Sequence, residues 1–267
     1  MHKKLLAVFA HPDDEAFGPA GTLAYYAKEG VEIHLLCATR GEAGENRIKN
    51  YEVRIRNNKA PKTPPRWPSL TWTPRMVEGS ERVAKIREKE LLKSAKILGI
   101  KKVEFLDFID GELRNNIYHQ VAEKIINKIH TFKPQVVLTV ERRGVSGHLD
   151  HIAISMITTY SYLKTKEPKK LYYHCLPFEM RDKMMDNYFV YFPEGYSRKE
   201  ITTKIDYSCC WEEKVKSMKA HQSQIKDVKN LLNRFQKWPK VDHFILQYHR
   251  GVKVSLPETD LFAGIDH

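Results

Sequence analysis

No part of the 267-residue sequence approaches the ~18 consecutive apolar residues that a membrane-spanning helix needs. The apolar run Leu5–Ala10 imitates the core of a signal peptide, but it is too short and leads into acidic rather than small residues. We therefore expect a protein without a membrane span, in which this first run is a buried strand.

Cysteine is also scarce: there are four, and none of them belongs to a C-x-x-C pair. This pattern excludes the common structural zinc sites and a disulfide scaffold, and it favours a reducing, cytoplasmic location. A chain of this length can bury a sufficient core without a metal or disulfide support, so a metal site here would be functional rather than structural.

A glycine-rich phosphate loop is missing too. The glycines after the first apolar run, Gly18 and Gly21, do not form G-x-G-x-x-G. Acidic residues stand where a pyrophosphate would need backbone N–H groups. These features argue against a nucleotide-binding module.

Positive charge is in excess, because 45 Lys and Arg against 33 Asp and Glu give a formal charge of +12. Residues 46–76 hold eight basic residues, one acid and five prolines, and we expect them to form an irregular insertion because proline excludes a long helix or a central strand. A nucleic-acid-binding protein would instead interleave basic and aromatic residues on a recognition element. The segment is either a solvated loop or an attractor for an anionic part of a small-molecule substrate.

Short apolar runs alternate with segments of helical periodicity as far as residue 176. The runs predict strands at residues 5–10, 31–38, 103–108, 136–140 and 171–176. The segments between them predict helices that end near residue 30 and that cover residues 81–98, 117–129 and 150–164. This alternation predicts a doubly wound, Rossmann-like α/β fold with a mostly parallel sheet in the order 3-2-1-4-5.

Beyond residue 177 we expect two further strands, at 188–192 and 201–207, and one long helix from Trp211 to Leu232. No linker-like composition and no internal repeat interrupts the chain, so residues 1–267 are expected to form a single domain.

Two polar motifs follow the first and fourth predicted strands. The first is Ala-His-Pro-Asp-Asp-Glu at 10–15, where Pro12 suits a first helical turn and places His11 and Asp14 three residues apart. The second is His-Leu-Asp-His at 148–151. Strands one and four are neighbours in the predicted order, and ligands bind at the carboxyl ends of such strands. Two histidines and an aspartate at this point predict a catalytic zinc site with an open position.

A simpler interpretation exists for each motif alone. Acidic residues at a helix start often only complement the helix dipole, and a histidine after a strand is often an ordinary loop residue. The joint placement of both motifs favours the metal site, whereas Glu15 is interpreted as a plain first-turn acid.

On these residues the chain resembles the LmbE-like, or PIG-L, family of zinc-dependent N-acetylglucosaminyl deacetylases. Both paired motifs of the family are complete here. The resemblance extends to further segments: 39–44 (Thr-Arg-Gly-Glu-Ala-Gly), 87–91, 106–111 and His221-x-Ser-Gln.

The resemblance implies that His11, Asp14 and His151 bind zinc and that Asp13 is the general base. It also implies that His148 and Asp150 form an acid or oxyanion-stabilising pair. From the chemistry we expect Asp150 to fix the tautomer of His148 and to raise its pKa. Whether His148 or protonated Asp13 protonates the departing amine stays open at this point.

Two further residues are candidates for substrate binding. Arg87 lies on the apolar face of its predicted helix, where an unpaired guanidinium would be costly. Its partner is either Glu90 or Asp110, or a sugar hydroxyl as the resemblance implies. Asp110 follows the third predicted strand at the same sheet edge.

The function expected from these residues is removal of an acetyl group from an N-acetylglucosamine-type conjugate by a zinc enzyme. The alternatives are a zinc amidohydrolase for a non-sugar N-acyl substrate and, on charge alone, a nucleic-acid-binding protein. The identity of the N-acetylated molecule and the presence of a homo-oligomer stay open.

Overall fold

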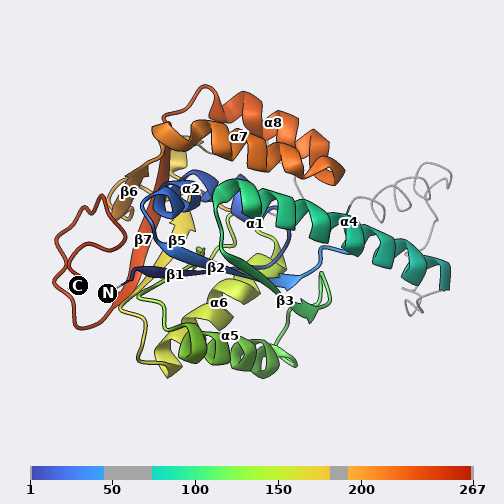
Figure 1. Cartoon of the computed structure of the whole chain (residues 1–267), viewed down its shortest axis with the longest axis horizontal. Coiled ribbons are helices and arrows are strands. Elements are labelled where there is room, and N and C mark those ends of the chain that lie inside the picture. The colour runs from blue at the N-terminus through green and yellow to red at the C-terminus, as the bar shows by residue number, and fades with distance from the viewer. Residues whose placement is uncertain (1, 45–73, 181–191, 266–267) are drawn as a thin grey trace, which may run out of the picture.

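The computed structural model describes residues 2–44, 74–180 and 192–265, and within them a seven-stranded sheet forms the centre of the molecule (Figure 1). The strands are β1 (Lys4–Phe9), β2 (Glu32–Thr39), β3 (Lys102–Phe108), β4 (Val136–Val140), β5 (Lys170–Cys175), β6 (Thr203–Asp206) and β7 (Val241–His249). Their order is β3-β2-β1-β4-β5-β7-β6. The first five strands are parallel, while β7 runs antiparallel to β5 and β6. The predicted order 3-2-1-4-5 and the mostly parallel sheet are therefore confirmed.

The central strands are apolar because both faces of the sheet are covered. Every residue of β4 and β5 is buried, as is β1 after Lys4. Helices α2 (Ala20–Lys28), α4 (Pro74–Leu98), α7 (Trp211–Ala220) and α8 (Ile225–Phe235) lie above the sheet in Figure 1, and α5 (Tyr118–Phe132) and α6 (Leu149–Lys164) lie below it. The two ends of the chain lie together at the left of this view.

Two predicted helices are each interrupted. After β1 the chain forms a short helix, α1 (Asp14–Phe17), and then α2, with Gly18 and Pro19 between them. Helix α1 begins two residues after Pro12, so Pro12 lies before the helix and not in its first turn as expected. The long helix expected from Trp211 to Leu232 is also wrong. It divides at His221 into α7 and α8, and the apolar periodicity runs through this break, which is why the sequence hides it.

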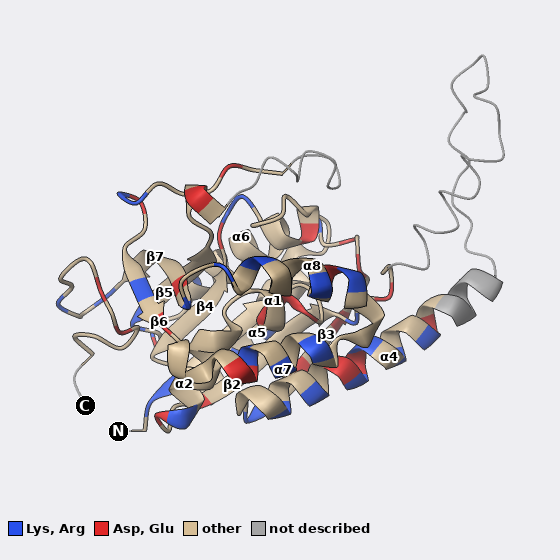
Figure 2. Cartoon of the chain, turned by 90° about the horizontal axis from the view of Figure 1, so that it is seen from above, with Lys and Arg blue, Asp and Glu red and all other residues tan. Residues whose placement is uncertain are grey.

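The boundaries of the basic insertion are partly outside the described residues. Residues 46–73 are not described, but Pro74 is the first residue of α4, so residues 74–76 are helical and not irregular. A proline is tolerated in the first turn, where its missing N–H is not needed. Acidic and basic residues both occur along the described part of α4 (Figure 2). Of the strand expected at 188–192, residues 188–191 lie outside the described ranges and Phe192 is not in a strand.

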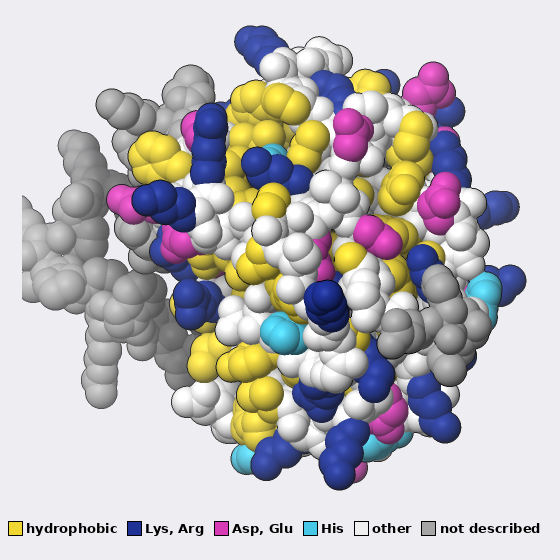
Figure 3. Space-filling view, turned by 90° about the vertical axis from the view of Figure 1, so that its left-hand side faces the viewer, with side chains coloured by type: hydrophobic (Ala, Val, Ile, Leu, Met, Phe, Trp, Pro, Cys, Tyr) yellow, Lys and Arg dark blue, Asp and Glu magenta, His cyan; other side chains and the backbone are white. Residues whose placement is uncertain are grey.

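No helix in the described ranges combines the length and apolarity that crossing a membrane requires. On the side that carries the chain ends, the drawn Lys and Arg side chains are dispersed among apolar and acidic ones (Figure 3). Among the described residues visible on that face, Lys and Arg form no continuous patch.

Candidate metal and catalytic site

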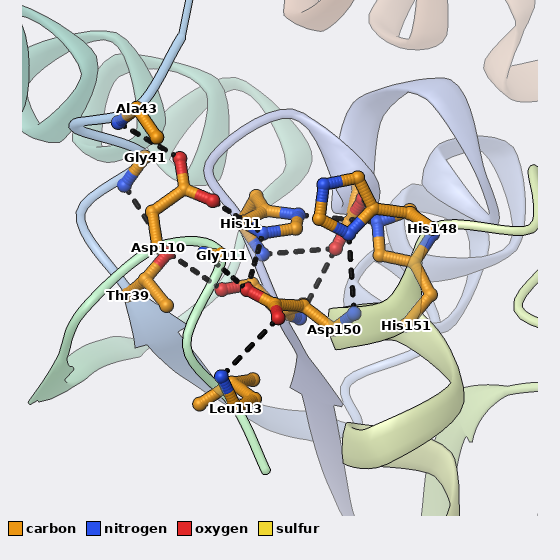
Figure 4. A network of polar contacts seen from close by, with 12 residues as sticks. His11, Thr39, Gly41, Ala43, Asp110, Gly111, Leu113, His148, Asp150 and His151 are labelled. Atoms are coloured by element: carbon orange, nitrogen blue, oxygen red, sulfur yellow. Dashed lines mark hydrogen bonds and ion pairs between the residues drawn. The ribbon is translucent and has the colours of Figure 1, made fainter. Parts of the chain in front are cut away.

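The two polar motifs meet at the carboxyl ends of β1 and β4, which are hydrogen-bonded neighbours (Figure 4). His11 follows β1, and His148 and His151 lie at the start of α6 after β4. Nε2 of His151 is 3.1 Å from Nδ1 of His11 and 3.1 Å from Oδ1 of Asp14. The three predicted metal ligands are thus brought together around one nitrogen atom.

The Asp14 carboxylate is oriented by the backbone of its own turn. Its Oδ2 accepts the N–H groups of Ala10 at 3.0 Å and of His11 at 2.9 Å, which leaves Oδ1 directed at His151. Burial alone would raise the pKa of Asp14, but the neighbouring His151 and His11 lower it well below its usual range. Asp14 is therefore a carboxylate at neutral pH, as a metal ligand must be.

In His11 and His151, the ring nitrogen that faces away from the other histidine, called the outer nitrogen here, lies beside a hydrogen-bond acceptor. Nε2 of His11 lies 3.0 Å from Asp110 and 3.2 Å from Asp150, and Nδ1 of His151 lies 3.0 Å from the carbonyl oxygen of Gly144. Acceptors at these positions hold the protons on the outer nitrogens and leave the inner lone pairs facing each other. Tetrahedral ligands at ~2.0–2.1 Å from zinc lie roughly 3.3–3.4 Å apart, close to the observed 3.1 Å. The residues present thus fit a metal ion.

Two overlapping groups of potential ligands surround His11 in the described residues. They are His11 with His148 and His151, and His11 with Asp110 and Asp150, and within each group the ligand atoms lie within 4.8 Å of one another. The hydrogen bonds distinguish the residues that would bind a metal from those that orient the binding residues. Asp110 and Asp150 contact the outer nitrogen of His11 and also accept backbone N–H groups, so they orient a ligand rather than replace one.

His148 precedes the first residue of α6, and its Nδ1 accepts the backbone N–H of Asp150 at 3.2 Å. This contact leaves the proton of the neutral ring on Nε2, which makes His148 a donor rather than a metal ligand. Burial and the charges of His11 and His151 lower the pKa of His148 to about 4, although Asp150 and Asp110 oppose the shift. Asp150 raises the pKa of His148 as expected, but burial and the charges of His11 and His151 outweigh its contribution.

The carboxylate of Asp150 has a different set of partners from the one expected. It accepts the N–H groups of Gly111 at 2.7 Å and Leu113 at 3.2 Å and lies beside His11. The backbone N–H of Asp150 bonds to the ring of His148. Asp150 thus fixes the tautomer of His148 through its main chain and orients His11 through its side chain.

Asp13 has a backbone conformation that residues other than glycine rarely adopt, with φ of 115° and ψ of −22°. Its carbonyl oxygen accepts the N–H groups of Ala16 and Phe17 at 2.9 and 2.8 Å, which begins α1. Such a conformation costs about 1–3 kcal/mol and is typical of functional turns. Burial raises the pKa of Asp13 to about 6, while Arg87 opposes the shift and Asp14 adds to it. A carboxylate with this pKa is suited to accept a proton near neutral pH.

Arg87, in α4, holds the turn that carries Asp13. Its guanidinium donates to the carbonyl oxygens of Gly41 at 2.8 Å and Pro12 at 2.6 Å, and lies 2.8 Å from Oδ2 of Asp13. The partner is thus Asp13 and neither Glu90 nor Asp110. A Cβ at Gly41, whose φ is +68°, would collide with this guanidinium, so the close approach requires glycine.

Asp110 is placed behind His11 rather than beside Arg87. One oxygen lies 3.0 Å from Nε2 of His11, and the other accepts the N–H of Ala43 at 3.0 Å. Its own N–H donates to Oε1 of Glu42 at 2.9 Å. Despite burial, the contact with His11 lowers the pKa of Asp110 well below its usual range. Both substrate-binding candidates therefore contact catalytic-site residues in this structure.

The sequence interpretation missed one member of the site. Glu15, taken as a plain first-turn acid, is only 1% exposed and contacts Asp13 and His221. The acidic pattern at residues 13–15 suits a helix start equally well, so the pattern alone carried no signal for this role.

Residues 6–161 match the PIG-L family, described as GlcNAc-PI de-N-acetylase. The chain belongs to this family. The resemblance drawn from the two motifs is thus confirmed, and with it the enzyme class, hydrolases that cleave an amide bond.

Two relatives match along almost their whole length. Mycothiol S-conjugate amidase of Streptomyces coelicolor is 28% identical over 309 residues, which cover 98% of this chain and 97% of that protein. The 1D-myo-inositol 2-acetamido-2-deoxy-alpha-D-glucopyranoside deacetylase of Acidothermus cellulolyticus is 26% identical over 307 residues, which cover 100% of this chain and 96% of that protein.

A similar solved structure is that of GalB, the 4-carboxy-2-hydroxymuconate hydratase of Pseudomonas putida. Its TM-score is 0.65 at 18% identity, covering 95% of this chain and 99% of that one. This likeness confirms the fold alone. Because a hydratase shares the fold, the reaction has to be argued from the residues of the site.

Proposed function

We propose that this chain is a zinc-dependent deacetylase that removes the acetyl group from an N-acetylglucosamine-type conjugate. The observation that carries the proposal is the convergence of His11, Asp14 and His151 on one point, with a buried carboxylate of pKa about 6, Asp13, in the same turn. The name of one relative, a deacetylase of an inositol-linked 2-acetamido sugar, supports an acetyl group as the part removed and an amino sugar as its carrier.

His11, Asp14 and His151 would hold the metal. Zinc in such a site supplies a Lewis acid for the amide carbonyl and lowers the pKa of a water from 15.7 to about 7. Asp13 orients that water and accepts its proton, which a carboxylate with a pKa about 6 does readily near neutral pH. Arg87 keeps Asp13 in place by bonding both its side chain and the preceding carbonyl.

The ring of His148 lies beside those of His11 and His151, with ring centres 4.7 and 5.2 Å apart. As a neutral donor, Nε2–H of His148 can stabilise the negative charge that develops on the carbonyl oxygen. A ring with a pKa about 4 holds no spare proton at neutral pH, so we assign protonation of the leaving amine to Asp13. The products are acetate and the free amino sugar.

The proposal is tested with purified full-length protein, its bound metal measured, on a panel of N-acetylated amino sugars with detection of free amine. An N-acetyl amino acid is the non-sugar control. We expect about one zinc per chain and sugar deacetylation that a chelator abolishes and added zinc restores. Activity confined to the amino acid would favour the non-sugar amidohydrolase, and metal-free protein without hydrolysis would refute the proposal.

We also propose a reducing, cytoplasmic location. All four cysteines are free thiols, and Cys37, Cys175 and Cys210 are buried.

A further inference from the structure

A buried carboxylate that the proposed reaction does not use lies behind the turn of Asp13. Oε2 of Glu15 accepts the backbone N–H of Asp13 at 3.0 Å. Oε1 accepts the hydroxyl of Ser94 at 2.6 Å and lies 2.7 Å from Nε2 of His221. The exposed fractions are 1% for Glu15 and 0% for both Ser94 and His221. Both oxygens are therefore engaged within the protein, and no substrate can contact them.

The turn of Asp13 needs a partner on its N–H side. The carbonyl oxygen of Asp13 is held by the first N–H groups of α1, from Ala16 and Phe17, and Arg87 holds its side chain. The N–H of Asp13, whose φ is 115°, has the Glu15 carboxylate as its acceptor. Without Glu15 this partly buried donor would lose its partner in the protein, which favours a different backbone conformation.

His221 is brought to Glu15 by the interruption between α7 and α8. Its φ of −83° and ψ of 68° end α7 and turn the chain into the short segment Gln222–Gln224. The ring then lies 6.1 Å from that of Phe17, centre to centre, and its Nε2 reaches Glu15. The break between α7 and α8 therefore places Nε2 of His221 within hydrogen-bond distance of Oε1 of Glu15.

We propose that Glu15 and His221 form a positioning pair for Asp13. His221 fixes the Glu15 carboxylate, and Glu15 fixes the backbone of the base, so that the Asp13 side chain faces the reacting water. The proposal rests on the proposed function in that Asp13 is taken as the base. Because both side chains are buried and bonded within the protein, they would act through Asp13.

The competing explanation is that the pair only packs α7 and α8 against the sheet. Glu90 provides a matched comparison, because it is a buried carboxylate of α4 that binds the same segment. It accepts the N–H and the hydroxyl of Ser223, both at 2.7 Å, two residues after His221. Its bonded partner lies in the segment after His221 and not in the turn of Asp13.

The test compares the full-length parent with Glu15→Met, His221→Phe and the control Glu90→Met. For the first two we expect kcat to fall about 10–100-fold, as for a misplaced catalytic group, with KM changed less than about threefold. Bound zinc should stay stoichiometric, because the ligands of the metal are untouched. Glu15→Gln retains an acceptor for the Asp13 N–H and should recover part of the loss. Glu90→Met should keep the parental kcat.

Hydrogen exchange of the peptide covering residues 11–17 gives a second readout that needs no activity. It should exchange faster in Glu15→Met and His221→Phe than in the parent, and at the parental rate in Glu90→Met. Parental kcat and exchange in folded Glu15→Met or His221→Phe would overturn the proposal, as would an equal loss of kcat in Glu90→Met. A parent that hydrolyses no N-acetyl substrate would refute the proposed function instead, and the exchange data would still decide on the pair.

Discussion

Oδ2 of Asp13 lies 2.8 Å from a guanidinium nitrogen of Arg87, and the two side chains are 14% and 6% exposed. The same guanidinium nitrogen donates to the carbonyl oxygen of Pro12, the residue before Asp13. Helix α4 therefore neutralises the charge of the proposed base and fixes its position at the same time.

Replacing Arg87 by Gln should move the pH dependence of kcat. Arg87 lowers the pKa of Asp13, so its removal raises that pKa, and the acid limb of the kcat profile should shift to higher pH. Arg40→Gln is the control, since Arg40 pairs with Asp107 and Glu88 instead. If Arg87→Gln raises KM but leaves the acid limb of the kcat profile at the same pH, Arg87 contacts the substrate rather than the base.

Asp13→Asn should keep its zinc and lose about 10²–10⁴-fold in kcat, the usual contribution of a general base. In the parent, kcat should rise as the pH is raised through about 6, because burial places the pKa of Asp13 there and only the ionised form accepts a proton. Steady-state rates between pH 4.5 and 8 check both statements. An Asn variant with parental kcat at every pH would exclude Asp13 as the base.

Single Ala variants of His11, Asp14 and His151 should each lose stoichiometric zinc and all activity but remain folded. The core does not depend on the metal, because a chain of this length buries enough apolar surface without one. Metal analysis after gel filtration and thermal unfolding followed by circular dichroism are the measurements. Full zinc content in His151→Ala would contradict the ligand assignment.

His148→Gln should retain more activity than His148→Ala. A neutral His148 acts through its N–H, which the Gln amide can replace in part, whereas a protonated acid could not be replaced by an amide. We expect the Ala variant to lose about 10²–10³-fold in kcat, as for the loss of one oxyanion donor. Equal losses in both variants would favour a proton transfer by His148.

Glu258→Leu should destabilise the fold by about 3–5 kcal/mol, because it leaves Lys170 charged and unpaired in the core. The two side chains are 1% and 0% exposed, with 2.6 Å between Oε1 of Glu258 and Nζ of Lys170. Urea unfolding measures the loss. The double variant with Lys170→Met should recover most of it, and a single variant as stable as the parent would contradict the prediction.

The sheet order and the point at which the proposed metal ligands meet could be predicted because both depend on local patterns. Buried parallel strands are continuous apolar runs, and the motifs at residues 10–15 and 148–151 each follow such a run. Strand adjacency then sufficed to bring His11 and His151 together.

The partners of Arg87 and Asp150 could not be predicted, because they are decided by side-chain packing between distant segments. The sequence suggested Glu90, Asp110 or a sugar hydroxyl as the partner of Arg87, yet α4 brings it to the turn of Asp13. The contact of His221 with Glu15 could not be predicted either, because a helical pattern that continues across a break gives no sign of the break.

The hydrogen bond between Glu15 and His221 joins residues 206 positions apart. During synthesis at roughly 5–20 residues per second, His151 leaves the ribosome several seconds before His221 does. A nascent chain would thus carry all three proposed metal ligands while the turn of Asp13 still lacks the contact between Glu15 and His221. In the proposed enzyme, metal capture would precede competence for hydrolysis, which would wait for the segment that carries His221.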